Sequence, residues 1–404
     1  MSNEYKYGSG CAKIIAMQNQ IIFSLFLIFC GAAILATLAL YTRQSMLVAY
    51  IILGFIIGPG GMKLISDPLV LKDIGDIGIV FLLFLLGLSL QPQNLFKMLR
   101  QATVVTLLSS LIFALIGYTL SVNVGFSHAD AIIIGACMMF SSTILGIKLL
   151  PTTVLHHQRI GEIVISILLL QDIIAIFTLL LLHGIYYGNY SLVDVGLVVL
   201  ALPAFFLIAF FAEKYILMKI IKKFNRIHEY LFLVAIGWCL GMGQLAETMK
   251  LSFEIGAFVA GVVLAQSPIS RFIAESLRPL RDFFLILFFF ALGAKIDPSV
   301  LSEIWLWALG LAILMLVFKP IVLHILLRKV APNKQAAWEV GIRIGQISEF
   351  SLLVGYSAEK SHIISPSAFS LIQVATILTF IVSSYWISNY YPTPIAAKDK
   401  LRRD

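Results

Sequence analysis

Long apolar runs separated by short polar segments make up nearly the whole chain. The runs are about 20 residues long, the length at which an α-helix crosses the hydrocarbon of a bilayer. They do not show the ten-residue alternation of membrane barrel strands. Because backbone polar groups find no water in hydrocarbon, the pattern predicts an all-α integral membrane protein. The thirteen predicted spans cover residues 20–40, 45–58, 73–91, 101–122, 129–150, 160–184, 192–213, 229–247, 252–266, 279–295, 304–328, 335–358 and 366–389.

Thirteen spans place the two termini on opposite sides of the membrane. The distribution of basic residues indicates which terminus is cytoplasmic. Twenty of the 29 Lys and Arg residues share a side with the C-terminus, and seven fall on the other side. Cytoplasmic segments of membrane proteins are enriched in Lys and Arg. We therefore predict a periplasmic tail at 1–19, a transmembrane domain at 20–390 and a basic cytoplasmic tail at 391–404, in a bacterial inner membrane.

The composition agrees with this interpretation and excludes several functions. Hydrophobic residues make up 60% of the chain and charged residues 12%, against about 25% charged residues in soluble proteins. The net charge of +8 reflects the cytoplasmic excess of basic residues, so the expected partner is membrane lipid and not nucleic acid. The sequence shows no nucleophile–base pair and no metal-ligand spacing, so we expect neither an enzyme nor a resident cofactor.

The second half of the chain repeats the first at an offset of 206 residues. The matched pairs are Gly87 with Gly293, Pro92 with Pro298, Gly135 with Gly341, and Ser142 with Ser348. The third span enters the membrane from outside and the tenth from inside, so the two repeats are inverted, as in many secondary transporters. The predicted units are repeat one at 20–184, a linker helix at 192–213 and repeat two at 229–389.

Asp172 is the clearest candidate for chemistry, because it lies about twelve residues into the sixth span. A carboxylate at mid-membrane must face a wet cavity or a partner. Burial disfavours its charged form, so it can hold either a proton or a monovalent metal cation, but not both. Its neighbour Gln171 offers an amide oxygen without a second charge. The alternative is an aspartate held by hydroxyl groups for packing alone.

Two polar interruptions in corresponding spans are candidate cation ligands. The fifth span contains Ser141, Ser142 and Thr143 between apolar stretches, and its repeat partner contains Ser348 and Glu349. Consecutive hydroxyl residues weaken a helix and offer the oxygen ligands that hard cations require. Close helix packing by small residues is the alternative. Because the interruptions match between the repeats, they predict a binding site built from two broken helices.

Three further charged residues within predicted spans are candidates for the site. Lys319 is nine residues from Arg328, too deep for its side chain to reach the interface easily. Its expected partner is Asp172 when no cation is bound, and another acid is the alternative. Arg343 and Glu349 could pair across the broken helix, with Arg343 in a structural role.

Several segments together resemble the monovalent cation:proton antiporter-2 family, above all its Kef-type potassium/proton members, over about residues 20 to 390. The segments are 53–59 (LGFIIGP), 84–90 (FLLGLSL), 141–143 (SST), 170–173 (LQDI), 256–265 (GAFVAGVVLA) and 348–350 (SEF). The resemblance implies a thirteen-helix fold with a dimerisation panel and a mobile core that contains two crossed, broken helices. It also implies a homodimer, an elevator-like or rocking movement, and Asp172 as the ion- and proton-binding residue.

The resemblance also bears on ion choice. Electrogenic sodium members have a second aspartate where this chain has Gln171, which favours an electroneutral exchange of K+, or of Na+, for H+. Lys319 before Pro320 is similar to the core lysine of some sodium antiporters. The nucleotide-binding domain of Kef proteins has no counterpart in this sequence, so nucleotide or glutathione gating is not expected. A separate regulatory subunit is a further partner to consider.

The sequence thus favours a secondary antiporter that works by alternating access. A cation channel or uniporter on the same scaffold is the first alternative, although a channel needs no obligate proton site. A membrane sensor that transports nothing is the second. The two alternatives differ from an antiporter in whether protons move against the cation gradient and whether Asp172→Asn is tolerated.

Overall fold

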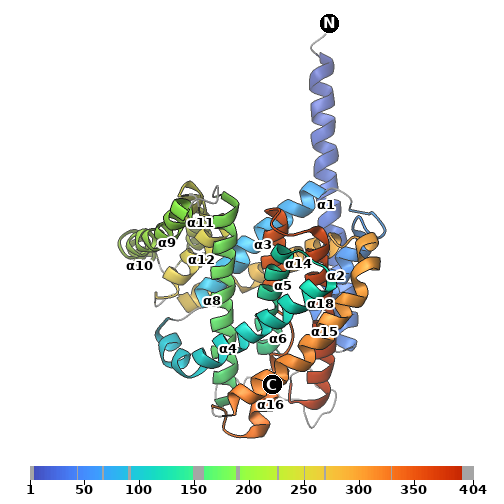
Figure 1. Ribbon diagram of the computed structural model, residues 1–404. Helices are drawn as coiled ribbons and strands as arrows, with labels where there is room; N and C mark the ends of the chain where they lie inside the picture. Colours follow the sequence, from blue (N-terminus) through green and yellow to red (C-terminus); the bar gives the residue numbers. More distant parts are fainter. Residues whose placement is uncertain are drawn as a thin grey trace.

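The computed structural model describes residues 4–42, 44–65, 68–89, 92–148, 159–187, 192–224, 227–249, 251–267, 270–328 and 330–393. These residues are almost entirely helical and contain no β-strand, which confirms the predicted all-α fold (Figure 1). The elements are α1 (Glu4–Tyr41), α2 (Met46–Ile57), α3 (Pro68–Ser89), α4 (Pro92–Val124), α5 (His128–Met138), α6 (Thr143–Lys148), α8 (Arg159–Tyr187), α9 (Leu192–Ala212), the π-helical turn η1 (Glu213–Leu217), α10 (Met218–Phe224), α11 (His228–Thr248), α12 (Phe253–Leu264), α13 (Ser270–Ser276), α14 (Arg278–Ala294), α15 (Pro298–Leu327), α16 (Lys334–Arg343), α17 (Glu349–Lys360) and α18 (Pro366–Tyr390).

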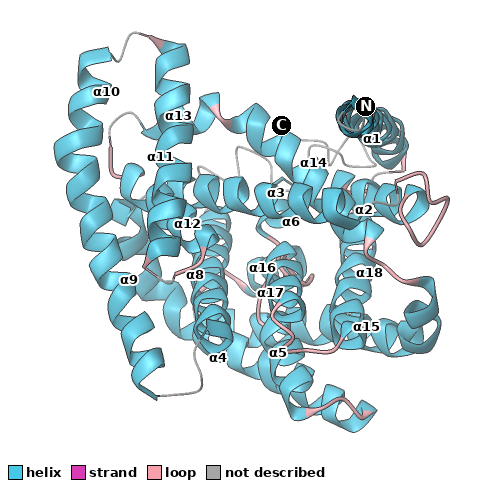
Figure 2. Cartoon of the chain, turned by 90° about the horizontal axis from the view of Figure 1, so that it is seen from above, coloured by secondary structure: helices cyan, strands magenta, loops and turns pink. Residues whose placement is uncertain are grey.

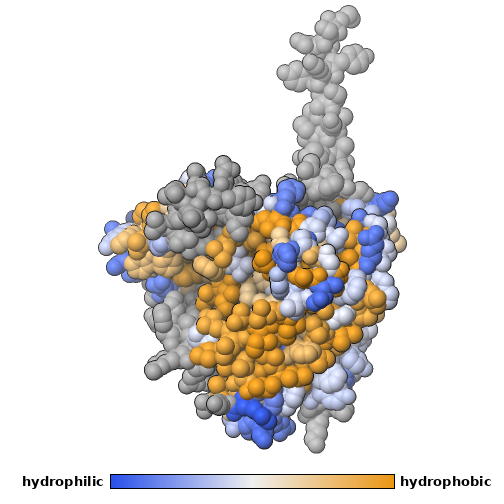
Figure 3. All heavy atoms as spheres, in the orientation of Figure 1, coloured by the Kyte–Doolittle hydropathy of each residue, from blue (hydrophilic) through white to orange (hydrophobic). Residues whose placement is uncertain are grey.

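Each of the thirteen predicted spans coincides with a helix or, for the fifth and twelfth, with two short helices that a break separates. Five described helices are long and apolar enough to cross a membrane by length and composition, and a broad apolar surface covers one face of the molecule (Figure 3). The number of crossings stays a prediction. The helix α1 begins at Glu4 and not near residue 20, and its first half projects beyond the bundle (Figure 1), because a helix once nucleated propagates at little cost.

The helices pack in two groups. The first, which we call the panel, contains α1, α2, α3, α9, α11, α12 and α14. The second, which we call the core bundle, contains α4, α5, α6, α8, α15, α16, α17 and α18. Figure 2 shows the panel along the upper and left sides of the molecule and the core bundle below it. The predicted division into a panel and a core is therefore visible in the packing.

The internal repeat also appears in the helix boundaries. The offset of 206 residues carries the start of α4 at Pro92 to the start of α15 at Pro298. It carries the first residue of α5 to that of α16, and the first residue of α6, Thr143, to that of α17, Glu349. The panel repeats in the same way, because α3 packs on α12 as α14 packs on α2.

Glycines allow these two panel pairs to cross closely. A Cβ atom at Gly87 would clash with the carbonyl oxygen of Phe258 on α12, and one at Gly293 would clash with that of Ile51 on α2. Small residues at membrane helix crossings let the two backbones approach. The matched glycines Gly87 and Gly293 therefore serve helix packing and lie apart from the polar interruptions.

Candidate functional site

Two breaks in the core bundle create the site. The chain leaves helical geometry after Met138 and resumes it at Thr143, and it leaves again after Arg343 and resumes at Glu349. We call residues 139–142 linker one and residues 344–348 linker two. Because helical hydrogen bonds satisfy the backbone of each linker only in part, side chains supply further partners within the bundle.

Serines at matched positions restart both helices. The Ser142 hydroxyl accepts a hydrogen bond from the Leu145 N–H at 3.1 Å, and the Ser348 hydroxyl accepts one from the Phe350 N–H at 3.0 Å. Serine is a preferred residue at this position, since its oxygen satisfies an N–H that lacks a helical acceptor. The repeat pair Ser142 and Ser348 thus has a capping role in both halves.

The half-helices of the two repeats contact each other beside the linkers. The Ser351 hydroxyl of α17 donates to the carbonyl oxygen of Cys137 on α5 at 2.5 Å, and the Cys137 thiol donates to the carbonyl oxygen of Ser351 at 3.4 Å. These reciprocal bonds connect α5 to α17, so the two breaks lie next to each other in the bundle.

The uninterrupted helix α8 passes linker one and presents Gln171 and Asp172 to it. The Thr143 hydroxyl lies 3.1 and 3.0 Å from the two carboxylate oxygens of Asp172. The Ser141 N–H donates to Gln171 Oε1 at 3.0 Å. Both α8 side chains are fully buried, with Asp172 1% exposed. The structure therefore brings together Ser141, Thr143, Gln171 and Asp172.

Lys319 joins the two linkers. Its ammonium donates to the carbonyl oxygen of Phe140 in linker one at 2.6 Å and to that of Gln346 in linker two at 3.1 Å. It also lies 3.2 Å from the Ser141 hydroxyl. Carbonyl oxygens that follow the end of a helix carry partial negative charge, which favours a cation there. The structure thus gives Lys319 carbonyl partners, whereas the sequence predicted an ion pair with Asp172.

The remaining charged candidates lie at the two ends of linker two, with Arg343 at the end of α16 and Glu349 at the start of α17. Glu349 is buried at the first turn of α17, near enough for its charge to act on Asp172. Arg343 forms an ion pair of 2.8 Å with Glu339 one turn earlier in α16 and donates to the carbonyl oxygen of Pro392 at 3.0 Å. These partners connect α16 to the segment after α18, which agrees with a structural role for Arg343.

Sequence reasoning missed Gln346, Thr379 and Ser383. The Ser383 hydroxyl donates to Gln346 Oε1 at 3.1 Å, and the Thr379 hydroxyl accepts from the Ile347 N–H at 3.1 Å. The sequence of α18 could have indicated Thr379 and Ser383, because polar residues recur there every three or four positions, as on one face of a helix. Gln346 is harder to find, because its counterpart at the same offset is the apolar Phe140.

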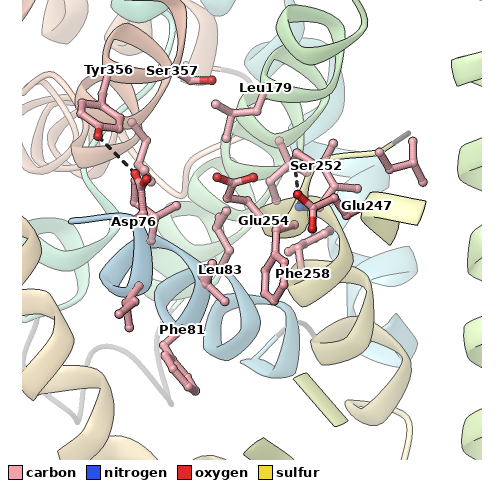
Figure 4. Close-up of a pocket in the computed structure, with 18 of the residues that line it drawn as sticks. Asp76, Phe81, Leu83, Leu179, Glu247, Ser252, Glu254, Phe258, Tyr356 and Ser357 are labelled. Carbon is pink, nitrogen blue, oxygen red and sulfur yellow. Dashed lines mark hydrogen bonds between the residues drawn. The ribbon is translucent and has the colours of Figure 1, made fainter. Parts of the chain in front are cut away.

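A cavity of about 550 Å³ lies between the panel and the core bundle. Figure 4 shows Asp76 and Tyr356 on one side of it and Glu254 and Glu247 towards the other. It also reaches Ile176, which lies one helical turn (about 5.4 Å) beyond Asp172 on α8. The cavity therefore approaches the buried carboxylate but stops among apolar side chains.

Polar contacts join the panel to the core bundle beside this cavity. Asp76 of α3 accepts a hydrogen bond from the Tyr356 hydroxyl at 3.1 Å (Figure 4). It also pairs with Lys360 at 2.9 Å. Lys295, after α14, lies 3.5 Å from Glu359 of α17. We call these the mouth contacts, since they connect α17 to two panel helices at one end of the cavity.

The arrangement suits exchange of small hard cations. A carboxylate, hydroxyls and linker carbonyls provide oxygen atoms, which are the ligands that such cations prefer. The described ion pairs include neither Asp172 nor Lys319. Lys319 and Asp172 therefore both bond to residues of the segment 140–143 without pairing with each other, and the carboxylate can gain a proton or a metal cation.

Comparison with known proteins identifies the family. The family model described as "Sodium/hydrogen exchanger, transmembrane" matches residues 24–390. This chain belongs to that family. The sodium/hydrogen exchangers are transporters, so the chain is a multi-pass membrane protein of a transporter family and the prediction that it is not an enzyme is confirmed.

Two curated relatives and one solved structure support the assignment of the chain to this family. The chain is 28% identical over 350 residues to K(+) efflux antiporter 6 of Arabidopsis thaliana, covering 84% of this chain and 58% of that protein. It is 28% identical over 346 residues to the glutathione-regulated potassium-efflux system protein KefC of Escherichia coli, covering 84% of this chain and 56% of that protein. It therefore spans little more than half of each relative.

The fold has a match among solved structures. The sodium proton antiporter MjNhaP1 from Methanocaldococcus jannaschii matches with a TM-score of 0.66 at 15% identity, over 92% of this chain and 96% of that chain. This chain resembles MjNhaP1 in fold over nearly its full length. The resemblance to Kef-type antiporters predicted from the sequence is confirmed by the relatives.

Proposed function

We propose that the chain is a secondary antiporter that exchanges a monovalent cation, K+ in the first place, for H+ by alternating access. The observation that carries this proposal is Asp172, a fully buried carboxylate whose described partner is the Thr143 hydroxyl alone. An uncompensated buried carboxylate costs several kcal/mol, roughly. It is therefore stable with a proton or with a metal cation, and each expels the other.

Two observations support K+ and an electroneutral exchange. Gln171 contributes an amide and not a second carboxylate next to Asp172, so one cation replaces one proton. The relatives named above carry potassium efflux in their names. Na+ is the alternative cation. Exchange measured in vesicles with K+ and, separately, with Na+ decides between the two.

The packing supports a movement of the core bundle against the panel. The cavity lies at the boundary of the two groups, and Asp172 lies in the core bundle, so a shift at this boundary opens the site to one side at a time. We further propose a homodimer that forms through the panel, in a bacterial inner membrane with the N-terminus in the periplasm. The excess of basic residues on the side of the C-terminus supports this orientation.

The proposal predicts that Asp172→Asn abolishes exchange while the protein stays folded. Asparagine can still accept a hydrogen bond from the Thr143 hydroxyl, but it has no carboxylate that could bind a proton or balance the charge of a cation. Purified protein in vesicles that contain a pH-sensitive dye is challenged with K+ and, separately, Na+. Asp130→Asn is the matched control: Asp130 is also buried, but it bonds the Ser365 N–H at 2.7 Å, away from the linkers.

Two results would contradict the proposal. Retained exchange in Asp172→Asn would exclude this carboxylate as the shared site. Cation flux by the wild type without any proton counterflow would show a channel or uniporter.

A further inference from the structure

A row of buried polar side chains runs along one face of α18. Its members recur at helical spacing and lie within the bundle: Ser370, Gln373, Thr376, Thr379, Ser383, Ser384 and Ser388. Polar groups inside a membrane helix are costly unless a partner satisfies them. The partners of this row therefore show what it stabilises.

Some of these hydroxyls are satisfied within α18 itself. The Thr376 hydroxyl donates to the Ile372 carbonyl oxygen at 2.7 Å, and the Ser388 hydroxyl donates to that of Ser384 at 2.6 Å. Such bonds to the preceding turn are common for Ser and Thr in helices. They make no contact with the linkers.

Thr379 and Ser383 differ, because their hydroxyls bond to linker two. Thr379 donates to the Thr376 carbonyl oxygen at 2.8 Å and accepts from the Ile347 N–H at 3.1 Å. Ser383 donates to Gln346 Oε1 at 3.1 Å. Together they hold two successive residues, Gln346 and Ile347, of the segment between the helices α16 and α17.

Gln346 extends these bonds to the rest of the site. Its carbonyl oxygen accepts from the Lys319 ammonium at 3.1 Å, and its Nε2 lies 3.5 Å from the Ser142 carbonyl oxygen in linker one. The Ser383 hydroxyl on Oε1 orients the amide so that its NH₂ group faces that carbonyl. Gln346 is fully buried, so no water from outside replaces a lost partner.

We propose that Thr379 and Ser383 are positioning residues of the cation site, which act through Ile347 and Gln346 of linker two to fix Lys319 and thereby set the affinity for the cation. This inference rests on the proposed function. The Lys319 ammonium and a cation at Asp172 repel each other, and their separation depends on the carbonyl groups that hold the ammonium. When linker two loosens, the ammonium can move towards the carboxylate and compete with the cation.

The test compares hydroxyl removal with hydroxyl retention at one position. Thr379→Val and Ser383→Ala should each raise the cation KM about two- to tenfold, the factor expected for one lost hydrogen bond, with the maximal rate little changed. Thr379→Ser keeps the hydroxyl and should restore the wild-type KM. Thr376→Val is the matched control, because that buried hydroxyl bonds only within α18, and its KM should stay at the wild-type value.

A second readout separates this inference from the proposed function. The rise in thermal unfolding temperature on titration with KCl, against choline chloride, reports cation binding without transport. Thr379→Val and Ser383→Ala should need more K+ than the wild type and Thr379→Ser to reach the same fraction of the rise in unfolding temperature. If the wild type moves no protons, the proposed function fails, and this titration alone decides the inference. Wild-type behaviour of Thr379→Val, or an equal shift in Thr376→Val, would overturn it.

Discussion

Gln171 and Asp172 are adjacent in sequence but contact the break in the fifth predicted span through different groups. The amide oxygen of Gln171 accepts the backbone N–H of Ser141, while the carboxylate of Asp172 accepts the Thr143 hydroxyl. Gln171 Nε2 has no hydrogen-bond partner in the part of the chain that the structure describes. One side chain therefore fixes the backbone without charge, and the other provides the titratable group.

This difference leads to a prediction about charge. Gln171→Glu keeps the length of the side chain and the bond to Ser141, and Gln171→Asp adds a carboxylate on a shorter side chain. Either variant places a second titratable group beside Asp172, so more protons should move per cation and exchange should depend on membrane potential. Vesicles with a potential imposed by a permeant-anion gradient measure this, and Gln171→Asn is the neutral control.

The wild type should show no such dependence on potential. A wild-type rate that changes with the imposed potential would contradict an exchange of one cation for one proton.

At the residue scale, the sequence predicted the site only in part. Asp172 could be found because a lone carboxylate deep in an apolar run is rare and costly. The bonding partners of Lys319 could not, since backbone carbonyls have no signature in the sequence. Thr379 and Ser383 are ordinary hydroxyl residues, and their contacts with linker two depend on how α18 packs against the break.

At the element scale, the panel depends on two helix crossings that the repeat duplicates. Gly87 allows α3 to approach α12, and Gly293 allows α14 to approach α2. At both crossings the opposing atom is a backbone carbonyl, which cannot rotate away as the end of a side chain can. The crossings should therefore tolerate no added methyl group without a shift of the helix.

Gly293→Ala should accordingly destabilise the protein by about 1–3 kcal/mol, the usual cost of overpacking. Gly310→Ala in α15 is the control, because a Cβ there meets nothing within 4 Å, and alanine should be neutral or stabilising. Thermal unfolding in detergent measures both variants. Equal unfolding temperatures for Gly293→Ala and the wild type would show that the crossing is looser than described.

Helix boundaries were more predictable than contacts. The apolar runs located the helices, and the polar interruptions located both breaks, because hydroxyl and glycine residues weaken a helix inside hydrocarbon. The pairing of α3 with α12 and of α14 with α2 did not follow from the sequence. The glycines match between the repeats, but the match does not predict which helix each glycine packs against.

At the scale of the whole molecule, the mouth contacts join two groups of helices that the proposed mechanism requires to move. Asp76 with Lys360 and Lys295 with Glu359 are partly exposed pairs, each worth about 0.2–1 kcal/mol. Such contacts favour one arrangement of the groups but are weak enough to break in every cycle.

A covalent link at the same place should stop the cycle. In a protein without its native cysteines, Asp76→Cys with Lys360→Cys is joined by a short bifunctional thiol reagent that contains a reducible disulfide. Exchange should fall in proportion to the linked fraction and return after reduction. Tyr118→Cys with His128→Cys is the control pair, since these residues contact each other at 2.9 Å within the core bundle. Full exchange by the linked Asp76–Lys360 pair would exclude movement at this boundary.

The apolar end of the cavity has a consequence for the cell's energy supply. Ile176, Leu179 and Leu353 are among the apolar side chains that line the cavity, and hydrocarbon side chains of this kind exclude water from narrow passages. Along this cavity an idle protein of this design should insulate the membrane, because the carboxylate of Asp172 is not among the residues that line it. Proton-motive force is then drawn down only when a bound ion is carried across, and not by leakage through a resting molecule.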